Sequence, residues 1–264
     1  MKKSALYLNL FALCLASFQA VRAQDATPAP ATEVVAPAKV EPKEWTASAG
    51  FSAIINSGNA VNQTLGGNAL VGRKWGKNQI GATALGAYGR AKDPTTGVTN
   101  TNTKNWRSAL RYDRFLNETV SLFTLGHLGQ DEPSGFEWRY GNSTGLSHVL
   151  VNTDPNFLKY EGGYDYTREQ RTTAINANIH SGRFFFQYKY KFSAFALFGQ
   201  DVESLFNLKE GKDIRINTLT SLTMKLTDKI AFQTGFGVRF DNRPVAGFKR
   251  TDTTTQAGLV LSFL

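Results

Sequence analysis

The sequence predicts an all-β fold, a closed antiparallel transmembrane β-barrel of about twelve strands. Three observations lead to this prediction. Apolar or aromatic residues recur at every second position in short stretches from residue 45 to the carboxyl terminus, turn residues separate the stretches, and an export signal precedes them. A strand that faces lipid on one side and a polar lumen on the other requires this alternation.

The alternation is clearest in residues 183–192, where every even position is aromatic. The odd positions of this stretch are mostly charged or polar, as in Arg183, Gln187 and Lys189. A soluble sandwich also alternates, but it buries its apolar face against a second sheet and seldom exposes aromatic residues in strand after strand. The pattern therefore favours a barrel in lipid.

The amino terminus has the features of a secretory signal peptide. Lys2 and Lys3 precede an apolar run at residues 5–18, and Val21 and Ala23 are small residues at the positions that a signal peptidase reads. We expect residues 1–23 to be cleaved after Ala23 and the protein to reach the bacterial outer membrane. The one cysteine of the sequence lies inside this segment, so the mature chain has no disulfide and no cysteine nucleophile.

Residues 24–44 differ in composition from the rest of the chain. They hold four of the eight prolines, many alanines and no aromatic residue. Such a segment cannot bury enough apolar surface to offset the entropy lost on ordering. We expect a disordered, Pro/Ala-rich periplasmic leader, followed by an outer-membrane barrel over residues 45–264.

Turn chemistry and alternation divide the remaining chain into strands. We expect them near residues 45–55, 60–73, 79–90, 103–114, 119–130, 136–150, 157–168, 173–191, 194–206, 212–226, 229–241 and 251–263. Connections after even-numbered strands are short, as expected on the periplasmic side, and the two longest, at 91–102 and 242–250, follow odd-numbered strands. Residues 118–130 and 195–206 show no clean alternation, which is consistent with a bulge.

Successive residues of a strand point to opposite faces, so the odd or even position of a residue predicts its face. On this basis most charged residues of the strands are assigned to the lumen. This set comprises Arg107, Arg111, Asp113, Glu137, Arg139, Lys159, Glu161, Asp165, Arg183, Lys189, Lys191, Arg215, Lys225, Arg239 and Asp241. Ten of these residues are basic and five are acidic, so an open water path would favour anions. The candidates for setting selectivity are Arg107, Arg111, Arg139, Arg183, Lys189, Arg215 and Arg239.

Several short motifs occur in a characteristic order. They are Gly58-Asn59, the run at 111–116, Asp131, the Tyr-Glu-Gly-Gly-Tyr run at 160–164 and the segment from Pro244 to Asp252. Together they resemble the YdiY-like, salt-induced outer-membrane proteins, a family of unknown function, over essentially residues 45–264. The resemblance implies an outer-membrane barrel without an established biochemical activity.

The last strand carries an apolar stripe formed by Leu259, Leu261 and Phe263. We expect the barrel-assembly machinery to engage this stripe, with periplasmic chaperones acting before it. The chain departs from the usual pattern of such barrels because Leu264 follows the terminal aromatic residue.

The sequence offers no convincing catalytic constellation. Its three histidines lack metal-ligand spacing, and adjacent Ser147 and His148 would point to opposite faces of a strand. His127 and Asp131 are the best remaining acid and base candidates, although a solvated rim accounts for them more simply. Glu161 and Asp165 share one lumen face and fit a salt-bridged wall better than a catalyst. We expect no catalytic residue, no metal and no cofactor.

Two classes of function remain open, and a hydrolase is a less favoured third. The first is a narrow, weakly anion-selective passage for small solutes, and the second is a non-conducting envelope barrel that contributes to membrane integrity or salt tolerance. Cleavage of the signal lowers the net charge from +9 to +6. Because the basic residues are scattered and the chain is exported, we expect outer-membrane lipid and lipopolysaccharide as partners, and no nucleic acid.

Overall fold

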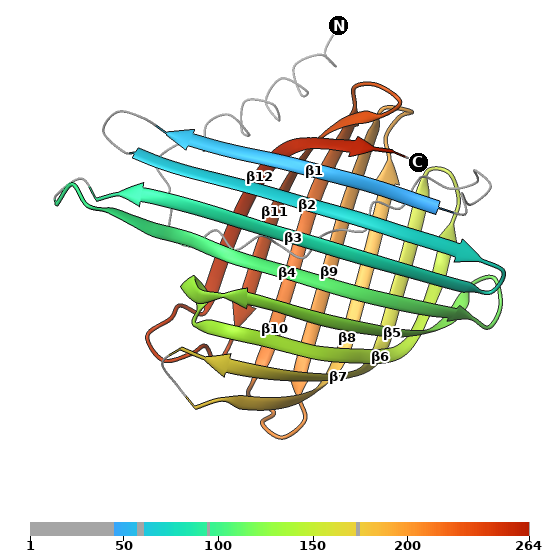
Figure 1. Ribbon diagram of the computed structural model, residues 1–264. Coiled ribbons are helices and arrows are strands. Elements are labelled where there is room, and N and C mark those ends of the chain that lie inside the picture. The colour runs from blue at the N-terminus through green and yellow to red at the C-terminus, as the bar shows by residue number, and fades with distance from the viewer. Residues whose placement is uncertain (1–44, 57–60, 94–95, 173–174, 264) are drawn as a thin grey trace, which may run out of the picture.

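The computed structural model describes residues 45–56, 61–93, 96–172 and 175–263. The predicted signal peptide and leader lie outside these residues. The described chain forms twelve antiparallel strands that close into a barrel in which every strand lies beside its neighbours in sequence and β12 meets β1 (Figure 1). The predicted fold class is therefore confirmed.

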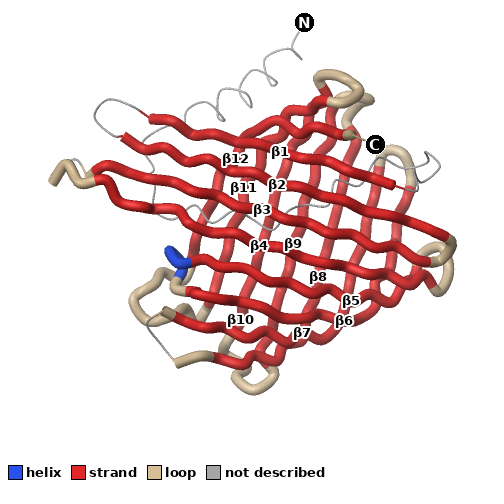
Figure 2. Tube along the Cα trace, viewed as in Figure 1, coloured by secondary structure: helices blue, strands red, loops and turns tan. Residues whose placement is uncertain are grey.

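The strands follow one another with short connections and one 3₁₀ turn, η1 (Glu132–Ser134). They are β1 (Trp45–Asn56), β2 (Val61–Trp75), β3 (Asn78–Lys92), β4 (Thr99–Phe115), β5 (Val120–Asp131), β6 (Phe136–Asn152), β7 (Asn156–Arg171), β8 (Ala177–Lys191), β9 (Ala196–Asn207), β10 (Ile214–Lys225), β11 (Ile230–Asp241) and β12 (Thr251–Ser262). Figure 2 shows how little of the described chain lies outside strands.

The two ends of the barrel differ in the length of their connections. The end at which β1 begins and β12 ends has connections of two to four residues, and we call it the short-turn end. At the opposite, long-loop end the connections have four to nine residues, and the segment 242–250 is the longest. The predicted connection at 91–102 is wrong in length, because β3 extends to Lys92 and β4 already begins at Thr99.

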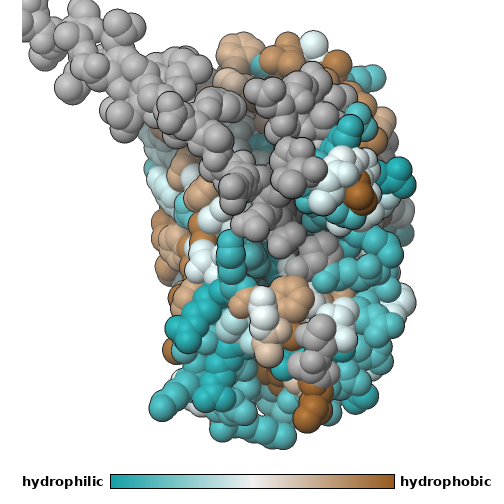
Figure 3. Space-filling view, turned by 90° about the vertical axis from the view of Figure 1, so that its left-hand side faces the viewer, coloured by the Kyte–Doolittle hydropathy of each residue, from teal (hydrophilic) through white to brown (hydrophobic). Residues whose placement is uncertain are grey.

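The alternation of the sequence corresponds to the two faces of the wall. In β8, Arg183 and Gln187 are buried inside, whereas the Phe184 side chain between them is 45% exposed on the outside. Figure 3 views the barrel towards its long-loop end, where hydrophilic residues cover much of the described surface and apolar residues lie along the flanks. Among the described residues, no helix is long and apolar enough to cross a membrane.

The two segments without clean alternation have a common cause. β5 and β9 point apolar residues into the lumen, among them Phe123, which is buried opposite Asp113, and Leu205, which lies opposite Arg183. When both faces of a strand carry apolar residues, odd and even positions no longer differ in polarity, and the sequence does not show which face is which. A register shift occurs near Gly129 in β5, as expected, but the pairing of β9 is regular on both sides.

The seam between β1 and β12 is the shortest ladder of the barrel. These strands pair over four positions, from Ser48 with Ser262 to Phe51 with Leu259. Each of the other neighbouring pairs has between 11 and 15 registered positions. Strands also extend past their neighbours elsewhere at the long-loop end, since residues 99–104 of β4 have no registered partner in β5 and residues 177–180 of β8 have none in β9.

The assignment of faces predicts a contrast between two neighbouring residues of β4. The Leu110 side chain is 55% exposed on the outer face, and Ala109 lines the interior cavity. Leu110→Arg should lower the free energy of unfolding by roughly 2–4 kcal/mol if it lies near the bilayer midplane. Ala109→Arg should cost much less because its guanidinium reaches water. Urea titrations of both variants in lipid vesicles measure the difference, and equal losses would contradict the assignment.

Candidate functional site in the barrel lumen

The lumen is divided into two cavities of unequal size. A vestibule of about 1350 Å³ occupies the short-turn half, and an outer chamber of about 100 Å³ lies in the long-loop half. Five residues line both cavities and form what we call the constriction: Leu85, Arg107, Leu125, Glu203 and Asn217. These side chains lie where the two cavities meet.

Glu161 of β7 is the centre of the first charge cluster. Its carboxylate is fully buried and lies 2.8 Å from Arg111 Nη2, 2.9 Å from Arg183 Nη1 and 3.3 Å from Lys159 Nζ. Arg111 also donates two hydrogen bonds of 2.7 Å to Asp113. Three cations from β4, β7 and β8 thus converge on one carboxylate.

Aromatic rings hold these cations in place from the other side. The guanidinium carbons of Arg111 and Arg183 lie 4.6 Å and 5.5 Å from the centre of the Phe123 ring. Arg183 also lies 5.2 Å from the centre of the Phe185 ring. Because a guanidinium is attracted to the face of an aromatic ring, the apolar side chains of the lumen position charges as well as fill space.

Glu169, also on β7 but nearer the long-loop end, is the centre of the second cluster. Its carboxylate is fully buried, lies 3.1 Å from Arg139 Nη2 and 2.7 Å from Arg171 Nη2, and accepts a short hydrogen bond from Arg215. Arg215 lies 3.3 Å from Asp241 as well. This cluster ties β6, β7, β10 and β11 together across the lumen.

The constriction contains one paired and one unpaired charge. Glu203 accepts hydrogen bonds from Arg183 Nε at 2.8 Å and from Asn217 Nδ2 at 3.0 Å. Arg107, by contrast, makes no ion pair and no hydrogen bond with any of the residues that the structure describes. Its guanidinium is therefore available to an ion or solute that passes between the cavities.

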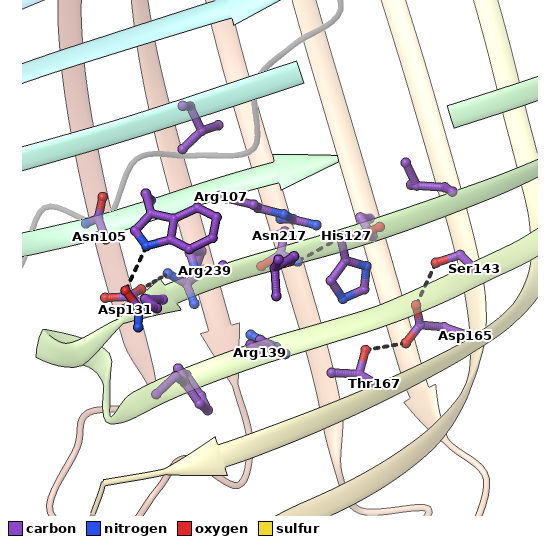
Figure 4. A pocket seen from close by; sticks show the side chains of 18 of the residues that line it. Asn105, Arg107, His127, Asp131, Arg139, Ser143, Asp165, Thr167, Asn217 and Arg239 are labelled. Carbon is purple, nitrogen blue, oxygen red and sulfur yellow. Dashed lines mark hydrogen bonds and ion pairs between the residues drawn. The ribbon is translucent and has the colours of Figure 1, made fainter. Parts of the chain in front are cut away.

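The outer chamber balances charges of both signs (Figure 4). Asp165 accepts hydrogen bonds from Ser143 at 2.6 Å and Thr167 at 2.8 Å. Asp131 forms an ion pair of 3.0 Å with Arg239. With three arginines and three carboxylates in its lining, the chamber has no strong preference for one sign of charge.

The vestibule, in contrast, has an excess of basic residues. Its lining includes ten of them: Arg73, Lys74, Arg107, Arg111, Lys159, Arg183, Lys189, Lys191, Lys225 and Lys229. Five acidic residues face them: Asp113, Asp154, Asp201, Glu203 and Asp228. The guanidinium of Arg73 lies 5.1 Å and 5.6 Å from the ring centres of Trp45 and Trp75, which are both exposed, so this charge is directed away from the lumen. The short-turn half of the lumen is nevertheless basic.

The structure separates the predicted selectivity residues into groups. Arg111 and Arg183 belong to the Glu161 cluster, and Arg139 and Arg215 belong to the Glu169 cluster. The remaining three differ in setting, because Arg107 lies in the constriction, Lys189 in the vestibule and Arg239 beside Asp131. A role of any of them in selectivity stays a prediction.

Three acidic residues of the lumen were not predicted there from the sequence. Glu169 was expected in a connection, but β7 continues to Arg171. Asp201 and Glu203 belong to β9, where alternation is weak. Continued parity could have found Glu169, since Glu161 and Asp165 precede it at intervals of four. Glu137, expected in the lumen, is exposed beside a register shift in β6, where alternation breaks down.

The histidines do not form a catalytic group with serine. Ser147 is buried inside opposite Glu161, whereas His148 points outward and its Nδ1 lies 2.9 Å from the Tyr160 hydroxyl. The predicted opposite faces are confirmed. His127 lines the outer chamber and Asp131 is buried, so the expectation of a solvated rim is wrong for both. The described residues include no group of three or more residues that could bind a metal ion.

The apolar stripe predicted on the last strand lies on the outer face. Leu259, Leu261 and Phe263 are all exposed. Their recognition by the assembly machinery stays a prediction.

Removing the central carboxylate tests how much the lumen depends on it. In Glu161→Gln three cations would remain packed around a neutral side chain, and leaving buried charges unpaired costs about 3–5 kcal/mol. Glu132→Gln is the control, because Glu132 forms an ion pair with Lys104 in which both side chains are largely exposed, and such pairs contribute little. Urea titrations should show a large loss for the first variant only, and equal midpoints would show that the cluster does not stabilise the barrel.

Comparison with solved structures shows the fold of a known barrel. The NanC porin superposes with a TM-score of 0.53 at 13% identity, covering 83% of this chain and all of that chain. The KdgM porin has 12% identity, coverage of 83% and 99%, and a TM-score of 0.44. The translocator domain of the autotransporter NalP from Neisseria meningitidis has 14% identity, coverage of 83% and 87%, and a TM-score of 0.43.

At the level of sequence, no curated protein matches the chain. A family does match, over residues 49–263, which include nearly the whole barrel. The protein belongs to this family, described as "Protein of unknown function, DUF481".

Proposed function

We propose that the protein lies in the outer membrane and provides a narrow, weakly anion-selective passage for small solutes. The observation that carries this proposal is the vestibule, whose lining has ten basic and five acidic residues and which meets the outer chamber at Arg107. Walls of low dielectric constant focus the field of their charges into the lumen. A fixed positive excess then lowers the barrier for anions and raises it for cations.

Arg107 is the residue with the largest expected effect on selectivity. The other arginines near the constriction are held by carboxylates, and Glu203, which faces the same space, is bonded to Arg183. A charge with a close partner of opposite sign contributes little field at a distance. The positive potential where the two cavities meet therefore rests mainly on Arg107.

A non-conducting envelope barrel is the second candidate, and one observation favours it. The Glu161 cluster joins to Glu203 through Arg183, and together with the Glu169 cluster it fills the lumen with side chains from most of the strands β4 to β11. The outer chamber beyond it has only about 100 Å³. A role in salt tolerance, as the narrower resemblance to the YdiY-like proteins suggests, would fit such a closed barrel.

Recordings from planar lipid bilayers distinguish the two candidates. Under a gradient of potassium chloride, the purified barrel should give a small conductance whose reversal potential indicates preference for chloride. The preference should fade as the salt concentration rises towards 1 M, where the Debye length falls to about 3 Å. Absence of any conductance would favour the closed barrel, and preference for potassium would refute the electrostatic argument.

The variant Arg107→Gln, measured in the same bilayer recordings, tests whether Arg107 sets the preference for anions. The variant should lose most of the preference for chloride while its conductance remains similar or rises. Arg168→Gln is a matched control, because Arg168 pairs with the Asn178 side chain on the outer face and does not line either cavity. An unchanged reversal potential in Arg107→Gln, or an equal change in the control, would remove Arg107 from this role.

A further inference from the structure

Two charged residues that line the outer chamber have no partner of opposite charge among the described residues. Arg107 makes no ion pair with any of them. Asp165 is buried, and its described partners are the neutral hydroxyls of Ser143, at 2.6 Å, and Thr167, at 2.8 Å. Buried charges in proteins are normally compensated by a charge of opposite sign. The chamber thus has one positive and one negative charge that this part of the chain does not compensate.

The remaining charged residues that line the chamber are compensated by the chain itself. They form ion pairs of 2.8–3.1 Å, namely Asp131 with Arg239, Glu203 with Arg183 and Arg139 with Glu169. A molecule that enters the chamber therefore meets two charges that differ from the rest, one of each sign. A simple anion or a simple cation would compensate only one of them.

The space beside the Arg107 side chain is kept open by a glycine. Gly129 of β5 lies opposite Arg107 of β4 on one side and opposite Arg139 of β6 on the other. No side chain therefore separates the two arginines in this row of the wall. Arg139 shares Glu169 with two other arginines, so it retains donors for a second carboxylate. The two guanidinium groups can bind one carboxylate from both sides.

The chamber also has room for a molecule between Arg107 and Asp165. These residues lie on β4 and β7, three strand spacings or about 14 Å apart along the wall. Gly141 lies opposite His127, where a Cβ atom would come within 3.0 Å of the imidazole ring, so the ring lies against the wall. In Figure 4 this ring lies between Arg107 and Asp165. The chamber of about 100 Å³ holds one molecule of a few non-hydrogen atoms, since a single water needs roughly 10–15 Å³.

We propose that the outer chamber is a binding site for a small zwitterion, an α-amino acid with a short side chain such as glycine or alanine. The carboxylate lies between Arg107 and Arg139, and the ammonium group lies beside Asp165. Both groups of a free amino acid are charged at neutral pH, so one molecule compensates both charges of the chamber. This inference goes beyond the proposed anion passage and does not depend on it, because a barrel that does not conduct can bind the same molecule.

Three probes of similar size test whether the site requires both charges. Ligand-observed NMR titrations of the unmodified barrel in detergent micelles compare glycine with acetate, which lacks the ammonium group, and methylammonium, which lacks the carboxylate. Glycine should bind about tenfold more tightly than either probe, since it makes one more contact between charged groups. These titrations measure binding without conductance, so their outcome is separate from that of the bilayer recordings.

Three results of these titrations would overturn the proposal. Acetate that binds as tightly as glycine would show a site for anions, and methylammonium that binds as tightly would show a site for cations. Glycine that shows no saturable binding would remove the site altogether.

Two variants assign the charges of the probe to the two residues. Arg107→Gln should weaken the binding of glycine about tenfold and leave that of methylammonium unchanged, whereas Asp165→Asn should weaken glycine by a similar factor and leave acetate no weaker. The matched controls are Arg243→Gln and Glu210→Gln, which remove one charge of each sign from an exposed ion pair that lines neither cavity. Equal losses in the controls would show that glycine responds to the total charge of the barrel, and would contradict the proposal.

Discussion

The need to pair every backbone polar group within the membrane governs this structure. Twelve strands satisfy it by closing on one another, and the alternation of side chains then separates an apolar exterior from a polar lumen. The charges of the chain are forced inward by the same geometry, because each strand offers only two faces. The ladder between β1 and β12 is the shortest of the described barrel, with four registered pairs against 11 or more for every other pair of neighbouring strands.

Inside the wall, the burial of charge has to be compensated locally. Glu161 and Glu169 are fully buried, and each lies against three cations from different strands. Clusters of this kind contribute little net stability compared with apolar packing, but they are sensitive to the loss of one member. Glu161 also compensates Arg111, Lys159 and Arg183, which are three of the ten basic residues in the lining of the vestibule.

Much of the fold could be predicted from the sequence, because alternating apolar and polar residues indicate a wall with one face towards lipid and the other towards a polar lumen. The strands failed to show alternation where the lumen itself is apolar, as at Phe123 in β5 and Leu205 in β9. The candidate site was harder to predict. Parity can place Arg107 and Arg111 on the same face, but it does not show that Arg111 has a carboxylate partner while Arg107 has none. That difference depends on contacts across the lumen, between strands far apart in sequence.

The central claim is that a continuous water path crosses the constriction and favours anions there. Leu85 lines both cavities, and the sequence has no cysteine beyond Cys14, so Leu85→Cys places one thiol at this point. The rate at which small charged methanethiosulfonate reagents modify this thiol in lipid vesicles is the most direct measurement. The account predicts that an anionic reagent reacts faster than a cationic reagent of the same size. A thiol that neither reagent reaches, or one that the cationic reagent modifies faster, would contradict it.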